Sequence, residues 1–325
     1  MTGQNLRLLL DKYKNINIFT HLRPDGDAIG SSLALGNALR HESKNIRLFC
    51  SDEIPSKYSF LPGVEVFQRY FEREEEEGLA IVLDCSDLKR LGHLSDALKE
   101  LNEIVNIDHH ITNEKFGDVN IIDSSAASTG EMIYKLLQTN NLEINKDICL
   151  CLYVAISSDT GSFKYENTTP QTMEIAGQLL EKGVNPAYVS ERIFDEYPLS
   201  TIPILRDSLS TLQLDDTGKV AWMQLSERVV LKHGAKPDQL DGFVNYAKNI
   251  MGVEVGVFFY HTEDGETKTG LRSKSIDVAA LAHKFGGGGH VRAAGCSIAG
   301  KPDDVVEKVI QAIKSGLENK VAAEK

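Results

Sequence analysis

A short polar segment near the start of the chain carries residue types that could bind a cation. His21, Asp25 and Asp27 fall within seven positions, directly after the apolar run 16–19. A proline and a glycine alternate with the two acidic residues, so this segment cannot be a regular helix. Two carboxylates held on one turn beside an imidazole repel each other unless a cation lies between them. The alternative is an ordinary acidic loop in which Asp27 caps the helix that follows.

Three later segments carry the same residue types at the ends of other expected elements. Asp84 directly follows an apolar run, and so does an Asp-His-His triplet at 108–110. Asp159 lies in a Ser-Ser-Asp-Thr-Gly turn. Open α/β sheets place their sites at the carboxyl ends of their strands, so we expect all four segments to meet at one edge of a sheet.

The residue types at this edge indicate which ions they would bind. Carboxylates mixed with imidazole suit a divalent ion such as manganese, with iron, cobalt and magnesium as lesser candidates. The absence of thiolate at these positions disfavours structural zinc. The candidate ligands outnumber the needs of one ion, whereas two ions about 3.5–4 Å apart, bridged by a carboxylate and a water, would use them fully. Such a pair generates hydroxide near neutral pH and holds a phosphoryl oxygen.

The elements that must position these residues alternate between strands and helices over about the first 160 residues. The expected strands are 16–19, 45–50, 79–83, 104–107 and 119–122. One expected helix starts at Ala28, and three others span 128–137, 146–157 and 170–182. This alternation predicts an α/β fold with a doubly wound, mostly parallel sheet.

The second half of the chain shows a different pattern, in which hairpins replace the alternation. Hairpins are expected at 211–225 and 253–272, each with a glycine-containing turn. They are followed by a helix at 276–285, a strand at 293–298 and a helix at 303–317. We therefore predict a catalytic domain at 1–190, a linker at 191–207 and, at 208–325, a smaller α/β domain with a mixed sheet.

The composition limits the class of protein. A chain of 325 residues, 42% hydrophobic and 25% charged, is typical of a two-domain soluble protein. It shows no apolar run long enough for a membrane span and no signal peptide. Five cysteines without zinc-type spacing suit a reducing cytoplasm. The net charge of −12 argues against binding of long nucleic acid, and the acidic run 72–77 is interpreted as a solvated loop.

A glycine run in the second domain is a candidate for contact with a ligand. Residues 286–289 are all glycine and His290 follows them, so backbone N–H groups can approach a phosphate or a base closely. A flexible helix end is the alternative, but one glycine would suffice for it. Arg90, which follows the third expected strand, is a candidate substrate contact or an ordinary surface arginine.

Together these motifs resemble the DHH phosphoesterase family, which is named for the triplet found here at 108–110. The segment His-Leu-Arg-Pro-Asp-Gly-Asp at 21–27 resembles the family's first motif, and Asp84, the triplet and Asp159 resemble the next three. Gly-Gly-Gly-Gly-His at 286–290 resembles the signature of the DHH-associated C-terminal domain. The resemblance covers essentially the whole chain. It is strongest to the subgroup of bifunctional nano-RNases and 3′-phosphoadenosine-5′-phosphate phosphatases.

The resemblance implies a role for each candidate residue. The ligands of the first ion would be His21, Asp25 and Asp84. The ligands of the second ion would be Asp27, Asp84, His109 and Asp159, so Asp84 bridges the two. His110 would face the scissile phosphate as a stabiliser or proton donor, while Asp108 orients its neighbours. The implied substrate contacts, to which we add Arg90, are Arg272, Ser273, Gly287, Gly288, Gly289 and His290. For Arg272 and Ser273 the alternative is a solvated strand end.

The implied function is that of a two-metal enzyme that hydrolyses short oligoribonucleotides to mononucleotides or removes the 3′-phosphate of phosphoadenosine phosphate. A related alternative is hydrolysis of cyclic di-AMP or of linear dinucleotides. A manganese inorganic pyrophosphatase would have a different C-terminal domain, and a RecJ-type exonuclease would need further nucleic-acid-binding domains. A non-catalytic nucleotide sensor would lack some metal ligands, whereas the set here is complete. The sequence leaves open whether the chain forms a homodimer.

Overall fold

The computed structural model describes residues 3–72 and 78–323. Most of the acidic run that we interpret as a solvated loop therefore lies outside the described residues. The chain divides into two compact units, residues 1–196 and 197–325. Among the described helices, none combines the length and the apolar character that a bilayer span requires.

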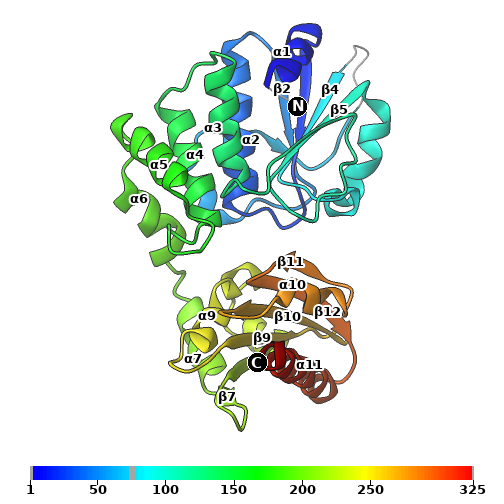
Figure 1. Ribbon diagram of the computed structural model, residues 1–325, viewed down its shortest axis with the longest axis vertical. Coiled ribbons are helices and arrows are strands. Elements are labelled where there is room, and N and C mark those ends of the chain that lie inside the picture. Colours follow the sequence, from blue (N-terminus) through cyan, green and yellow to red (C-terminus); the bar gives the residue numbers. More distant parts are fainter. Residues whose placement is uncertain (1–2, 73–77, 324–325) are drawn as a thin grey trace. The chain divides into compact units, whose positions relative to one another are not determined.

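A parallel sheet forms the centre of the first unit, as predicted (Figure 1). It contains the five expected strands and a two-residue strand at 67–68 that we did not predict. Its strands are β1 Asn15–Phe19, β2 Asn45–Phe49, β3 Phe67–Gln68, β4 Gly78–Leu83, β5 Glu103–Asp108 and β6 Val119–Ile122. They are ordered β3-β2-β1-β4-β5-β6, and every neighbouring pair is parallel. The order reverses between β1 and β4, so the segments that follow these two adjacent strands emerge side by side, where open α/β sheets bind ligands.

Helices cover both faces of this sheet. The α-helices are α1 Gly3–Lys12, α2 Gly26–His41, α3 Thr129–Thr139, α4 Lys146–Asp159, α5 Pro170–Glu181 and α6 Pro186–Ser190. The 3-10 segments are η1 Ser56–Tyr58, η2 Val64–Val66 and η3 Leu88–Glu100, and the π-helical segment is η4 Glu191–Asp195. One core contains residues of α1 to α5, and a second core on the other face contains residues of η3.

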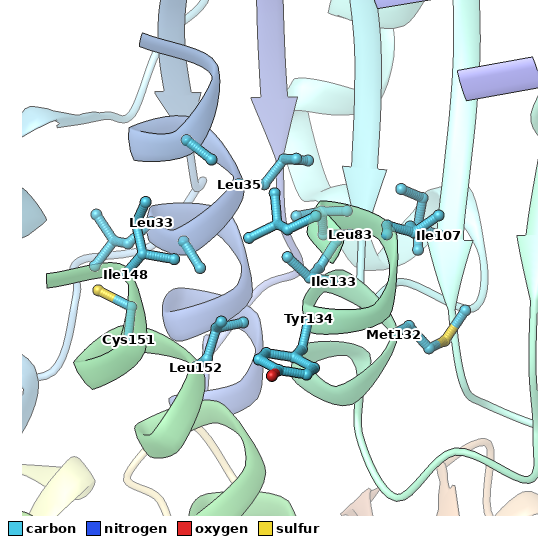
Figure 2. Packing of buried hydrophobic residues seen from close by; sticks show 14 of the residues in the cluster. Leu33, Leu35, Leu83, Ile107, Met132, Ile133, Tyr134, Ile148, Cys151 and Leu152 are labelled. Carbon is cyan, nitrogen blue, oxygen red and sulfur yellow. The ribbon is translucent and has the colours of Figure 1, made fainter. Parts of the chain in front are cut away.

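The alternation of side chains along the strands supplies both cores. Ile18 of β1 enters the core shared with the α-helices, whereas its neighbour Phe19 stacks on Phe49 of β2 in the core shared with η3. Figure 2 shows Leu83 at the end of β4 beside Ile133 of α3. Full burial of one such side chain stabilises the fold by about 1.5–3 kcal/mol. The strand ends that bear the candidate site are thereby held against the helices.

A mixed sheet, as predicted, forms the centre of the second unit, in the order β11-β12-β10-β9-β8-β7. Its strands are β7 Gln213–Leu214, β8 Val220–Ser226, β9 Val255–His261, β10 Glu266–Ser273, β11 Gly288–His290 and β12 Ala293–Ala299. β8 and β9 are parallel, and the other neighbouring pairs are antiparallel, including both expected hairpins.

The helical segments of the second unit are α7 Thr201–Leu209, α8 Glu227–Lys232, η5 Pro237–Leu240, α9 Phe243–Lys248, α10 Val278–His283 and α11 Pro302–Ala323. The prediction that the last helix ends at Leu317 was wrong, because α11 continues to Ala323. Within the segment 191–207, η4 is followed by most of α7.

Candidate metal centre

The polar segment after β1 leads directly into helix α2. Asp25 is the N-cap of α2, and its Oδ1 accepts the backbone N–H groups of Asp27 and Ala28 at 3.0 Å each. The prediction that the helix starts at Ala28 was therefore wrong, and so was the alternative in which Asp27 caps it. A Cβ at Gly26 would lie 1.9 Å from Ser158 Oγ. Glycine here lets the first turn of α2 lie against the last turn of α4.

Asp84 follows β4 directly and presents its two carboxylate oxygens to different imidazoles. Its backbone is left-handed, with φ of 56°. Oδ2 lies 3.3 Å from His21 Nε2, and Oδ1 lies 3.6 Å from His109 Nε2. A carboxylate that directs one oxygen toward each of two donor groups has the arrangement of a bridging ligand.

The remaining candidate ligands gather around these two imidazoles. The candidate ligands form two groups of three side chains, and within each group the donor atoms lie within 4.8 Å of one another. One group is His21, Asp25 and Asp84, and the other is Asp27, His109 and Asp159. His109 Nε2 lies 3.3 Å from Asp159 Oδ2 and 3.8 Å from Asp27 Oδ2. When six ligands lie about 2.1 Å from an octahedral ion, neighbouring ligands are roughly 3.0 Å apart and ligands on opposite sides of the ion are roughly 4.2 Å apart. The observed spacings fall between these values, so the donors fit a metal ion without large movement.

Crowding of the carboxylates shifts their pKa values. Burial, together with the charges of Asp84 and Asp159, raises the pKa of Asp27 well above its usual value. Burial and the charges of Asp25 and Asp84 also raise the pKa of Asp159. For Asp84, burial acts in the same sense, but the hydrogen bond with His21 and the nearby imidazole charges outweigh it and lower the pKa. A divalent cation would relieve the repulsion at Asp27 and Asp159, so the donor set fits a metal electrostatically as well.

Comparison with known proteins identifies the family of this chain. The DHH family N-terminal domain matches residues 15–156, and the DHHA1 domain matches residues 218–319. The bifunctional oligoribonuclease and PAP phosphatase NrnA of Thermus thermophilus is 32% identical to this chain, over 97% of this chain and 95% of that protein. The chain belongs to the DHH family.

Two further DHH relatives cover most of the chain. The bifunctional oligoribonuclease and PAP phosphatase NrnA of Bacillus subtilis is 29% identical, over 88% of this chain and 90% of that protein. The crystal structure of an exopolyphosphatase-related protein from Bacteroides fragilis superposes with a TM-score of 0.87 at 25% identity, over 98% of this chain and 95% of that one. Both units of the DHH protein are therefore present in a solved relative.

In the DHH triplet, Asp108 holds both histidines through one carboxylate oxygen. Oδ1 accepts the His109 backbone N–H at 2.8 Å and lies 2.6 Å from Nδ1 of His110. Oδ2 accepts a hydrogen bond from Asn113 Nδ2 at 2.6 Å, and Asn113 also donates to Asn106 Oδ1 at 2.8 Å. This network supports the proposed orienting role of Asp108. We did not single out either asparagine, although the polar Asn106 within an apolar strand was a visible signal.

The contact with Asp108 also changes the charge of His110. Burial alone would lower the pKa of this ring, but the bond to Asp108 and the charges of Asp84 and Asp108 raise the pKa to about 9. The charge of Arg90 lies near enough to lower the same pKa. The Arg90 carbonyl also accepts the backbone N–H of Leu22, which ties η3 to the segment that carries the candidate ligands His21, Asp25 and Asp27. Arg90 therefore lies at the periphery of the site.

Part of the glycine run of the second unit forms a strand that we did not predict. Helix α10 ends before the run, and Gly288–His290 forms strand β11 against β12. A Cβ at Gly287 would lie 2.2 Å from a carbonyl oxygen of β12, and one at Gly289 would lie 2.5 Å from another. Strand packing alone therefore requires these two glycines. A Cβ at Gly288 would meet nothing within 4 Å, and β11 is an edge strand, so close approach of a ligand remains a proposal for this position.

Arg272 lies in a cluster of cations at the end of β10. Burial and the charges of Arg272 and Lys274 lower the pKa of Lys248. Such a cluster favours an anion. The neighbouring Ser273 is buried, and its Oγ accepts the backbone N–H groups of Ser275 and Ile276, which gives it a role in the turn. We did not single out Lys248, because its proximity to Arg272 depends on how α9 packs.

Replacing Asp159 by asparagine is expected to stabilise the metal-free protein. Because the pKa of Asp159 is raised in the folded state, the unfolded chain loses this proton first as pH rises, and folding stability falls until the folded pKa is passed. Asparagine removes this cost, so the unfolding midpoint in EDTA at pH 7 should rise by about 2–4 °C. Calorimetry between pH 4 and pH 8 should show the difference growing with pH.

The same variant should gain less stability than wild type when Mn²⁺ is added, because it has lost a candidate ligand. Asp96→Asn is the matched control, since Asp96 is exposed on η3 and pairs with Lys99. A lower midpoint for Asp159→Asn in EDTA would show that the protein itself satisfies this carboxylate, contrary to the repulsion described above.

Proposed function

We propose that this protein is a two-metal phosphoesterase, with Mn²⁺ as the preferred ion, that acts on short oligoribonucleotides and on phosphoadenosine phosphate. The observation that carries the proposal is that Asp84 directs one carboxylate oxygen toward each of two donor groups. The relatives named oligoribonuclease and PAP phosphatase support the substrate class. The free, buried cysteines suit a cytoplasmic location.

The proposed mechanism assigns a task to each part of the site. Two bound ions would supply a hydroxide nucleophile and neutralise charge on the phosphoryl oxygens. As the hydroxide oxygen forms its bond to phosphorus, the bond from phosphorus to the leaving ribose oxygen would break, and His110 would give that oxygen a proton. Because Nδ1 of His110 is bound to Asp108, the proton comes from Nε2. Arg272, beside Lys248, binds a phosphate of the substrate.

Product analysis with purified, Mn²⁺-loaded protein tests this assignment. The panel contains RNA of two to five nucleotides, phosphoadenosine phosphate, cyclic di-AMP, the linear dinucleotide that opening of cyclic di-AMP gives, and pyrophosphate. We expect mononucleotides from the RNA and adenosine monophosphate from phosphoadenosine phosphate. Faster turnover of the cyclic dinucleotide or of pyrophosphate would replace the proposed substrate class.

The hydrolysis rate per molecule should fall as an RNA substrate grows beyond about five nucleotides. A net charge of −12 disfavours retention of a long strand, because each added phosphate is repelled by the protein's overall negative charge. We expect a decrease of about tenfold between five and twenty-four nucleotides at low salt. Initial rates on end-labelled oligomers, with stepwise release of mononucleotides, provide the measurement. Equal or rising rates on the longest substrates would favour a polymer exonuclease.

A further inference from the structure

The first residue of helix α3 contacts two candidate metal ligands that come from different parts of the chain. The backbone N–H of Thr129 donates to Asp27 Oδ2 at 2.6 Å, and its side-chain Oγ1 donates to Asp84 Oδ1 at 3.1 Å. Thr129, Asp27 and Asp84 are all almost completely buried. One residue therefore connects the carboxylate at the start of α2 with the carboxylate at the end of β4.

The start of α3 is built for these contacts. Ser128 is the N-cap and accepts the N–H of Glu131, whereas the N–H groups of Thr129 and Gly130 both donate to Asp27. These are backbone donors that a helix start leaves without intrahelical partners, and the helix dipole adds to their attraction for a carboxylate. A Cβ at Gly130 would lie 2.4 Å from that of Ala155, so glycine lets α3 approach closely enough.

We propose that Thr129 is a positioning residue that fixes the carboxylates of Asp27 and Asp84 in one geometry, so that the second ion binds a preformed site. This inference rests on the proposed two-metal function. The hydroxyl of Thr129 donates to Oδ1 of Asp84, the oxygen that faces His109, and not to Oδ2, which faces His21. Its loss should therefore weaken the ion held by the group Asp27, His109 and Asp159 more than the other ion.

The asymmetry arises because hydrogen bonds behind metal ligands set the orientation of the ligands. With its hydroxyl removed, Thr129 still supplies a backbone N–H to Asp27, but Asp84 Oδ1 loses the partner that holds it. Loss of such a partner typically weakens metal affinity by about 10–100-fold. The effect should appear in binding as well as in turnover.

Titration of chelator-treated protein with Mn²⁺ tests the proposal. Calorimetry measures the affinity for each ion, and electron paramagnetic resonance detects the coupled two-ion signal. Thr129→Val removes the hydroxyl and keeps the branched shape, and Thr129→Ser keeps the hydroxyl. We expect Thr129→Val to bind one ion as wild type does and the second about 10–100-fold more weakly, with loss of the coupled two-ion signal. Thr129→Ser should restore the second affinity to near the wild-type value.

Thr139→Val is the matched control, because Thr139 lies at the exposed end of the same helix. If Thr129→Val fails to fold, as judged by its unfolding midpoint in EDTA, Thr129→Ala takes its place. Unchanged affinity for both ions, or an equal loss of both, would overturn the proposal. If wild type binds a single ion whose affinity still falls in Thr129→Val, the positioning role stands and the two-metal function fails.

Discussion

Asp84→Asn is expected to abolish binding of both ions and to lower kcat by about 10³-fold or more. A metal pair contributes several kcal/mol to stabilisation of the transition state, and each 1.4 kcal/mol corresponds to about tenfold in rate. Asparagine is the informative substitution, because Asp84 has a left-handed backbone, with φ of 56°, that asparagine tolerates better than alanine does. The variant therefore removes the charge while it preserves the turn after β4.

Metal content after desalting and initial rates at saturating Mn²⁺ measure both effects. Asp96→Asn should retain two ions and the wild-type rate, because its carboxylate is exposed on η3. Retention of both ions by Asp84→Asn at a near-normal rate would contradict the bridging assignment. Loss of one ion only would assign Asp84 to a single site.

Unlike Asp84→Asn, which should lose both metal and activity, His110→Asn should turn over slowly while its metal content stays intact. The asparagine amide can replace Nδ1 as the partner of Asp108 Oδ1, which His110 contacts at 2.6 Å. It cannot donate a proton as an imidazolium does, so kcat should fall by about 10²–10⁴-fold.

A competing assignment makes this comparison decisive. Asp84, Asp108, His109 and His110 also lie close enough to share an ion. If His110 were a ligand, His110→Asn would lose an ion together with its activity. His93→Asn controls for loss of an imidazole, since His93 is exposed on η3 and pairs with the Arg69 carbonyl.

Five of the strands and the candidate ligand segments of the first unit could be predicted because their signals are local, whereas β3, with two residues, is too short to show a pattern. The apolar run 119–122 corresponds to β6, and each candidate ligand lies next to a run whose period is visible in a single chain. The start of α2 was placed two residues late, because a proline and a glycine are ordinarily poor helix residues. The structure shows that Gly26 is needed there for contact with Ser158.

The contacts that complete the site are not local, and no sequence pattern predicts them. Thr129 and Asp84 are 45 positions apart, and the hydrogen bond between them depends on how α3 docks on the sheet. The same holds for β11, whose glycines fit β12 because of the close approach of two backbones. Helix α1 is a different case, since the spacing of Leu6, Leu9 and Leu10 was a visible signal that we did not use.

The candidate ligands are synthesised one after another, but neither group can bind an ion until all of its members are present and folded. His21 is made first and Asp159 last, at the end of α4, and the two ends of this set are separated by most of the first unit. A nascent chain that stops before α4 carries Asp84 and several other candidate ligands but lacks Asp159, so the group Asp27, His109 and Asp159 is incomplete. Stabilisation by free metal ions depends on binding to the folded state alone, so it is gained only once α4 has docked. In the proposed two-metal site, uptake of the second ion would thus report that synthesis has passed Asp159 and that α4 has docked, before α5 and α6 are complete.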